Sequence, residues 1–185
     1  MIRVPQVLGL MTVITIFVMG CSSIPTQEMS DARQAIKAAR EVKATDYIPL
    51  SLVDAEQALA QAEHELEAGY LQQARQHAII AKKQAVKAHN TAVALERAQL
   101  IWETVAALED SFNQDKTLLK QAQHAAQCNQ MDKALILAEQ AYYQGEQALN
   151  QAYLHRAWTL IETAQQHQAT LSLSQLELLQ EAHSA

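Results

Sequence analysis

Histidine, cysteine and carboxylate side chains are the groups in this sequence whose chemistry could matter, and their spacing decides what they can do. The seven histidines include no pair four residues apart, the spacing at which one helix face presents two metal ligands, and no His-Glu-x-x-His motif occurs. Glu103 and Glu162 each follow an arginine by six residues, but carboxylates act together in acid–base catalysis only where a pocket unites them. No glycine-rich phosphate loop and no nucleophile elbow is present. We therefore expect no catalytic residue, no metal site, no cofactor and no enzymatic activity.

Cys128 is one of only two cysteines, so no disulfide framework is expected. It stands where a predicted helix ends, and we interpret it as a small turn residue; a disulfide to a second copy in an oxidising compartment is the alternative. The formal net charge is −6, and positive and negative residues are interspersed. No basic stripe is present that would follow a phosphate backbone, so nucleic acid is not an expected partner.

The other cysteine, Cys21, follows an N-terminal segment with the composition of a processing signal. Arg3 is followed by an uncharged apolar run from Val7 to Met19 and then by Gly20-Cys21. The segment resembles a bacterial lipoprotein signal with its lipobox, which implies that residues 1–20 are a signal peptide cut between Gly20 and Cys21. Cys21 would then carry acyl chains such as palmitate, and residues 21–26 would be the lipidated cysteine and a short spacer. The alternative is a simple N-terminal membrane helix.

The residue after Cys21 indicates the membrane to which the lipoprotein would be sorted. Ser22 is not an aspartate. By resemblance to the sorting rule of enteric bacteria, it favours the periplasmic face of the outer membrane, where several acyl chains would hold the protein on the lipid bilayer.

The remaining sequence predicts an all-α protein organised around one helix. It contains 33 alanines, and only two glycines and two prolines follow residue 20. Between Leu71 and Leu95, small apolar residues recur in steps of three and four, which places them on one helix face against closely packed neighbours. This seam consists of Leu71, Ala74, Ala78, Ala81, Ala85, Ala88, Ala92 and Leu95. A second apolar stripe beside it, formed by Ile79, Val86 and Val93, indicates a further neighbour.

Turn signals divide the chain into six predicted helices, over about 27–43, 51–68, 70–110, 115–128, 131–168 and 175–183. Thr45 to Pro49 breaks the chain after the first helix, because a residue before proline avoids the helical region. Gly69-Tyr70 forms the turn before the seam helix, with Gly69 in the left-handed conformation that ends many helices. Ser174 and Glu177 have the spacing of a capping box, which predicts the start of the last helix.

The sequence matches itself when Leu59 is aligned with Leu119, which indicates an internal repeat of about 60 residues. Eleven residues between Leu59 and Ala92 are identical to their counterparts in this alignment: Leu59, Gln61, Ala62, His64, Ala74, Ala78, Ala81, Gln84, Ala88, Asn90 and Ala92. We interpret residues 27–110 as one helical unit and residues 111–185 as its duplicate, ending in a truncated third copy. Long helices of about 57 Å, at 1.5 Å per residue, alternate with helices half as long, so we predict antiparallel hairpins in an elongated, staggered bundle.

Residues 38–92 carry a family resemblance. It rests on Tyr47, Pro49, Leu52, Ala55, Leu59, Ala62, Gly69, Tyr70, Ala74, Ala78, Ala81, Ala85 and Ala88. With this pattern the segment resembles the bacterial lipoprotein domain called domain of unknown function 4398. The resemblance implies an envelope lipoprotein of helical hairpins and brings no known activity or catalytic residue. The Gly-Tyr turn followed by spaced alanines is also similar to the hairpins of tetratricopeptide repeats, although those repeats have a much shorter period.

These features favour a non-enzymatic role. We expect an outer-membrane lipoprotein that acts as a helical scaffold or adaptor and offers a helix groove to another envelope protein, with a homo-oligomer as a further possibility. The alternative is a cell-wall-binding accessory factor that supports an enzyme acting on peptidoglycan.

Overall fold

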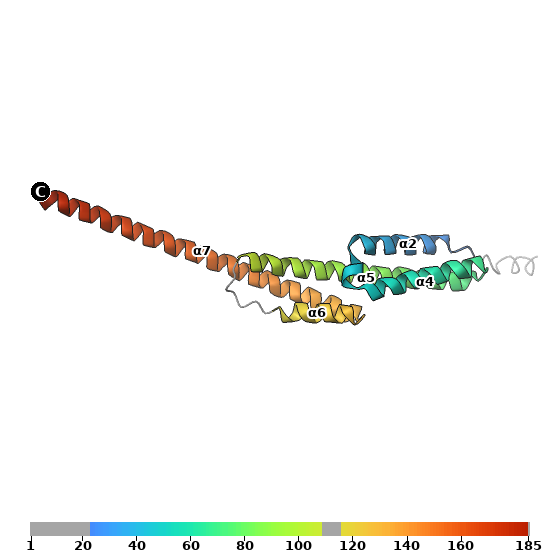
Figure 1. Cartoon of the computed structure of the whole chain (residues 1–185). Helices are drawn as coiled ribbons and strands as arrows, with labels where there is room; N and C mark the ends of the chain where they lie inside the picture. The colour runs from blue at the N-terminus through green and yellow to red at the C-terminus, as the bar shows by residue number, and fades with distance from the viewer. Residues whose placement is uncertain (1–22, 109–115, 185) are drawn as a thin grey trace, which may run out of the picture. The chain divides into compact units, whose positions relative to one another are not determined.

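A computed structural model describes residues 23–108 and 116–184 of the chain. Its elements are α2 (Thr26–Glu41), α3 (Ala44–Tyr47), α4 (Pro49–Glu67), α5 (Leu71–Leu108), α6 (Thr117–Gln127) and α7 (Met131–Ser184) (Figure 1). Within these ranges every element is a helix, which confirms the predicted all-α class. The chain divides into two compact units between His89 and Asn90, inside α5.

The break predicted from Thr45 to Pro49 is shorter than expected. Lys43 takes a left-handed conformation with φ of 54°, and the four-residue helix α3 then fills the segment before α4. Pro49 is the first residue of α4, where its fixed φ suits a helix and its missing N–H has no partner to lose. The proline therefore starts a helix as well as ending the preceding one.

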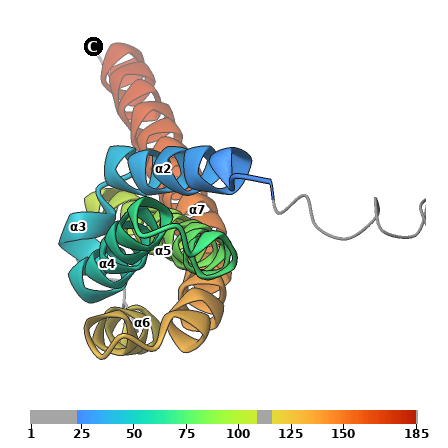
Figure 2. The ribbon, with the colours of Figure 1, turned by 90° about the vertical axis from the view of Figure 1, so that its right-hand side faces the viewer.

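The first unit is a bundle of α2, α4 and the first half of α5, which lie side by side (Figures 1 and 2). One cluster of its core combines a buried residue from each of the three helices: Met29, Ala62 and Ala78. The ion pairs Arg33–Glu63 and Arg40–Glu56 join α2 to α4 at 2.8 and 2.7 Å. Two more, Arg75–Glu28 and Lys82–Asp31, join α5 to α2, each at 2.8 Å. Such surface pairs add little stability, but they favour one register of the three helices.

The second unit packs the second half of α5 against α6 and α7. Its core contains Ala98, Trp102 and Val105 of α5, Leu119 of α6 and Ala141 of α7. The Trp102 indole donates a hydrogen bond from Nε1 to the carbonyl oxygen of Ala141 at 3.0 Å. This bond satisfies the polar atom of the largest side chain in that core.

Gly145 allows α5 and α7 to approach each other closely. A Cβ at this position would lie 2.5 Å from Cγ2 of Ile101 and 3.4 Å from Nε1 of Trp102. The helix continues through Gly145 without a break. The glycine is therefore explained by packing, because any side chain would push the two helices apart.

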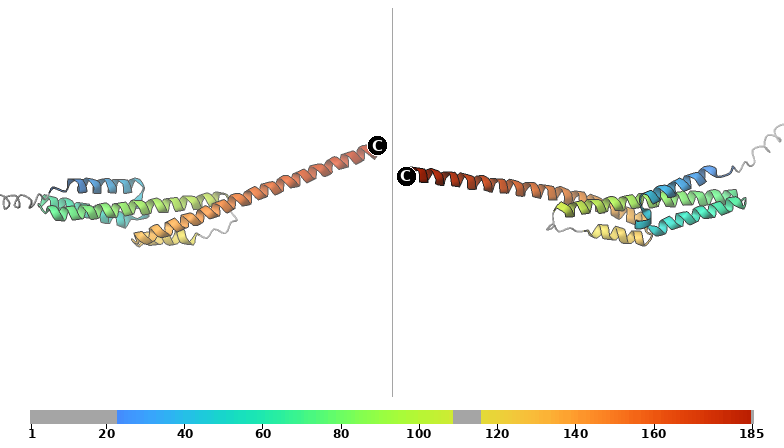
Figure 3. Two further views of the ribbon diagram at one scale, coloured as in Figure 1. Left: turned by 180° about the vertical axis from the view of Figure 1, so that it is seen from behind. Right: turned by 45° about the horizontal axis from the view of Figure 1, so that its top comes forward.

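The predicted separate helix over residues 175–183 is wrong. α7 runs without interruption from Met131 to Ser184, and Ser174 lies inside it (both views of Figure 3). After Gly145 the sequence contains no glycine or proline, so nothing forces the backbone to turn. A capping-box pattern favours a helix start only where the chain already breaks, and here the helix-forming residues on both sides prevail.

Candidate functional site

The predicted lipidation and cleavage residues, Cys21 and Gly20, lie outside the described residues. The described chain begins two residues later, and its first residue is bound to the first unit. The Arg75 guanidinium of α5 donates from Nη2 to the carbonyl oxygen and to Oγ of Ser23, at 2.8 and 3.0 Å. Pro25, two residues after Ser23, is buried. The segment that follows Cys21 is thus attached to the folded bundle within a few residues.

The predicted seam of α5 is the most deeply buried line of side chains in the chain's described part. Its alanines, from Ala74 to Ala92, have no exposed surface, whereas Leu71 at the start of the helix is half-buried. The neighbouring apolar stripe is different: Ile79 is 50% exposed and Val86 42%, whereas Val93, the third residue of the stripe, is half-buried. The seam therefore serves packing, and the stripe beside it remains accessible.

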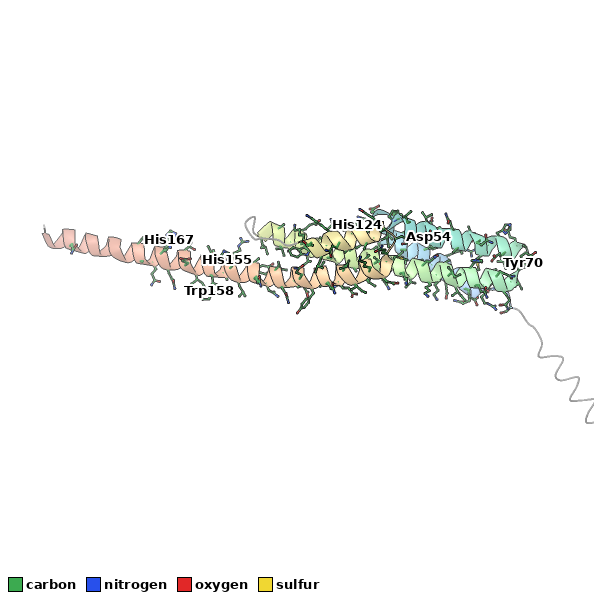
Figure 4. The ribbon with its side chains drawn as sticks, turned by 90° about the horizontal axis from the view of Figure 1, so that it is seen from below. Asp54, Tyr70, His124, His155, Trp158 and His167 are labelled. Carbon is green, nitrogen blue, oxygen red and sulfur yellow. The ribbon has the colours of Figure 1, made fainter. Side chains whose placement is uncertain are left out.

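The Gly69-Tyr70 turn has the geometry that the sequence predicts. Gly69 is left-handed, with φ of 81°. The N–H groups of Gly69 and Tyr70 donate to the carbonyl oxygens of Leu66 and Glu65, at 3.1 and 2.8 Å. These two bonds close a Schellman motif, which satisfies carbonyl groups at the end of α4. The Tyr70 side chain is exposed at this end of the first unit (Figure 4).

The turn between α6 and α7 repeats this geometry in the second unit. Asn129 replaces the glycine with φ of 59°, a conformation that asparagine tolerates better than other residues with a side chain. The N–H groups of Asn129 and Gln130 donate to Ala126 and Ala125, at 3.0 and 2.9 Å. Burial also recurs: the pattern of residues 61–80 is that of residues 121–140, except that Leu66 is half-buried and Ala126 is buried.

A nearly buried carboxylate connects α4 to α5 in the first unit. Gln61 donates to Oε1 of Glu65 at 2.9 Å, and Nδ1 of His77 lies 2.7 Å from Oε2. The hydrogen bond from Gln61 lowers the pKa of the Glu65 carboxyl below its ordinary value, and His77 adds to this effect. The Glu65 carboxylate therefore stays ionised although it is almost removed from water. Its hydrogen bonds to Gln61 and His77 give it a structural role, because the contact with His77 joins α4 to α5.

His124 and Cys128 form a pair that the sequence analysis missed. The Cys128 thiol is free and exposed, and its Sγ lies 3.8 Å from Nε2 of His124, one helical turn earlier. They line a shallow groove of the second unit with Lys120 and Lys133. The signal in the sequence is the four-residue spacing of the histidine and the cysteine, which places both side chains on one face of a helix. Two ligands beside two lysines form no metal site by themselves.

The remaining candidates are not brought together. Glu103 accepts a hydrogen bond from Gln99, whereas the Glu162 side chain is exposed on α7. Arg97 stacks on the ring of Tyr142, 4.5 Å from its centroid. Trp102 belongs to the core, but Trp158 projects from α7 and is 69% exposed (Figure 4). The described residues therefore provide no pocket that unites Glu103 and Glu162 for acid–base catalysis.

Two properties of the described residues bear on other classes of site. Among residues 23–108 and 116–184, no group of three or more histidine, cysteine, aspartate or glutamate side chains is placed to hold a metal ion. No helix in the same ranges combines the length and the apolar character needed to cross a membrane.

One protein family matches this chain. The family model described as domain of unknown function (DUF4398) matches residues 27–100, which include α3, α4 and most of α2 and α5. No curated protein and no solved structure matches the chain. The match covers the buried seam and the Gly69-Tyr70 turn, the features on which the resemblance in the sequence rests.

Proposed function

We propose that this chain, whose residues 27–100 match the DUF4398 family model, is a non-enzymatic helical scaffold or adaptor of the bacterial cell envelope. Its partner would be another envelope protein that binds a helix surface. One observation carries the proposal: the α5 helix buries its alanine seam but leaves the parallel apolar stripe accessible at Ile79 and Val86.

The stripe has the properties of a helix-docking surface. Ile79 and Val86 are seven residues apart and therefore lie in line on α5, with the exposed Ile80 one position further along the chain. Lys83 lies between them in the sequence and is exposed, so a partner helix with an acidic residue beside its apolar face fits best. Aligned apolar side chains exposed at helix spacing indicate binding more strongly than scattered ones do.

A site-specific crosslinking experiment tests this surface. A photo-crosslinking residue in place of Ile79 should yield an adduct with one envelope protein when the full chain is expressed in cells. The same residue in place of Gln57, which is exposed on α4 of the same unit, should yield none. Equal adducts at both positions, or none at Ile79, would contradict the scaffold. Sedimentation of the purified chain with isolated sacculi would instead favour the cell-wall-binding alternative.

We also propose that the chain is a lipoprotein of the outer membrane, anchored through acylated Cys21. The support is the Gly20-Cys21 pair after an uncharged apolar run, together with Ser22. Cys21→Ser should abolish palmitate labelling and leave an uncleaved precursor, because no thiol would remain to accept the lipid. Cys128→Ser is the matched control and should label normally. Labelling of the Cys21→Ser chain would contradict the lipid anchor. Recovery of the wild-type chain with inner-membrane markers would contradict the outer-membrane location.

Finally, we propose that the chain is built from a duplicated helical hairpin with a repeat of about 60 residues, similar in character to tetratricopeptide hairpins. The matching turn hydrogen bonds at Glu65–Tyr70 and Ala125–Gln130 support this proposal. The sequence predicts long helices of about 57 Å that alternate with helices half as long, and on this basis we propose an elongated, staggered bundle. Small-angle scattering tests the shape, because a compact fold of this length has a radius of gyration of about 15 Å.

A further inference from the structure

Residues 153–170 of α7 have no covering neighbour within the part of the chain that the structure describes. Ala152 is buried, but every residue from 153 to 170 is exposed. In Figure 1 and in both views of Figure 3, no other described element of the second unit lies beside this segment. His155, Trp158 and His167 mark it in Figure 4, where Trp158 projects away from the helix.

This segment carries an apolar face that is large for a surface helix. Five large apolar side chains are 48–69% exposed: Tyr153, Leu154, Trp158, Leu160 and Ile161. At these fractions they leave roughly 600 Å² of apolar surface, given the 150–250 Å² that an aromatic side chain can bury. Contiguous apolar patches of that size mark interaction sites in soluble proteins.

We propose that this face pairs with the same face of a second copy of the chain, with the two helices antiparallel. The proposal rests on a seam of Leu154, Ala157, Ile161 and Ala164, spaced by three, four and three residues as in a coiled coil. Large and small residues alternate along this seam. In an antiparallel pair with its two-fold axis beside Thr159, Leu154 faces Ala164 of the second copy and Ile161 faces Ala157.

The alternation selects the antiparallel direction. Each layer then combines one large and one small side chain, which keeps the distance between the helices constant and fills the interface evenly. A parallel pair would place Leu154 against Leu154 and Ala157 against Ala157, so that crowded layers would alternate with empty ones. A two-fold arrangement of this kind uses the same patch on both copies and closes at a dimer.

Area and charge both fit a second copy as the occupant. Two faces of roughly 600 Å² bury about 1,200 Å² in total, the lower end of the range for specific interfaces. The only residues of 153–170 with full charges, Arg156 and Glu162, lie on the flanks outside the seam. A membrane surface is a poorer occupant, because helices that lie on anionic lipid carry several lysines or arginines on their polar face.

Crosslinking from within the seam tests the pairing in the full chain. A photo-crosslinking residue in place of Ile161 should give a covalent dimer in cells, with the attachment mapped by mass spectrometry near Ala157 of the second copy. The same residue in place of the exposed Thr163, on the opposite side of α7, should give at least tenfold less dimer. Attachment to position 161 itself would overturn the antiparallel direction. A phospholipid adduct, an adduct with another protein only, or no adduct would overturn self-pairing.

A matched pair of substitutions tests the seam itself. Leu154→Glu places a carboxylate in the interface and should reduce the Ile161 crosslink at least tenfold. Gln166→Glu adds the same group on the opposite side of the helix and should leave the crosslink unchanged. Both residues are exposed, so neither change disturbs a core. An unchanged crosslink with Leu154→Glu would exclude this seam. Adducts from Ile79 report separately on the proposed envelope partner, so either proposal can fail without the other.

Discussion

Replacing Trp102 by alanine should lower the free energy of unfolding of the second unit by about 3–5 kcal/mol, as is typical when a buried tryptophan is truncated. The indole is 2% exposed and packs among residues of α5, α6 and α7. The substitution leaves a cavity at the point where Gly145 lets two helices approach, and it removes the hydrogen bond to Ala141. Chemical denaturation of the full chain, followed by circular dichroism, measures the loss.

Trp158 provides a matched control in the same unit. Trp158→Ala removes the same side chain from α7, but this indole is 69% exposed and has little contact to lose. Its effect on stability at low protein concentration should stay within about 0.5 kcal/mol, the usual range for surface substitutions. Similar losses for the two variants would mean that Trp102 is not the centre of this core. Trp102→Phe should fall between them, because it keeps most of the apolar volume but cannot donate the hydrogen bond.

The two tryptophans also show what the sequence could and could not predict. Helix periodicity places both on apolar faces, since Trp102 follows Ala98 by four residues and Trp158 follows Leu154 by four. It does not reveal which face the chain itself covers. Trp102 is buried because α6 and α7 fold against it, whereas the described chain supplies no helix to cover residues 153–170. Periodicity identifies a surface that needs a partner, and tertiary structure decides where the partner comes from.

Turn residues in the sequence predicted the backbone conformation correctly where few residue types tolerate that conformation. Gly69 predicted a left-handed residue, and the structure has one there. Asn129, a weaker signal, adopts the same conformation because the carbonyls at the end of α6 need the same two hydrogen bonds. The helix start predicted at Ser174 is wrong because its signal is too weak to break the backbone. A capping pattern supplies about 1 kcal/mol, too little to break a helix without a glycine, a proline or a packing partner.

Replacing Ala78 by leucine should destabilise the first unit by about 1–3 kcal/mol, the usual effect of inserting a larger side chain into a filled core. Ala78 has no exposed surface and meets Met29 of α2 and Ala62 of α4, so three helices converge on one methyl group. The additional carbon atoms cannot be accommodated unless α2 or α4 moves outward. That movement would also separate the ion pairs of Glu28 and Asp31 with α5, at 2.8 Å in the native bundle.

Ala60→Leu is the matched control, because Ala60 lies on α4 of the same unit and is exposed. Alanine and leucine are both strong helix formers, so this control should change stability by no more than about 0.5 kcal/mol. The melting temperatures of the two variants, measured side by side by circular dichroism, decide the question. An Ala78→Leu protein that melts with the wild type would mean that the α5 seam does not hold α2 and α4 together. A second substitution, Met29→Ala, should restore part of the lost stability in the Ala78→Leu chain, since it removes volume from the same contact.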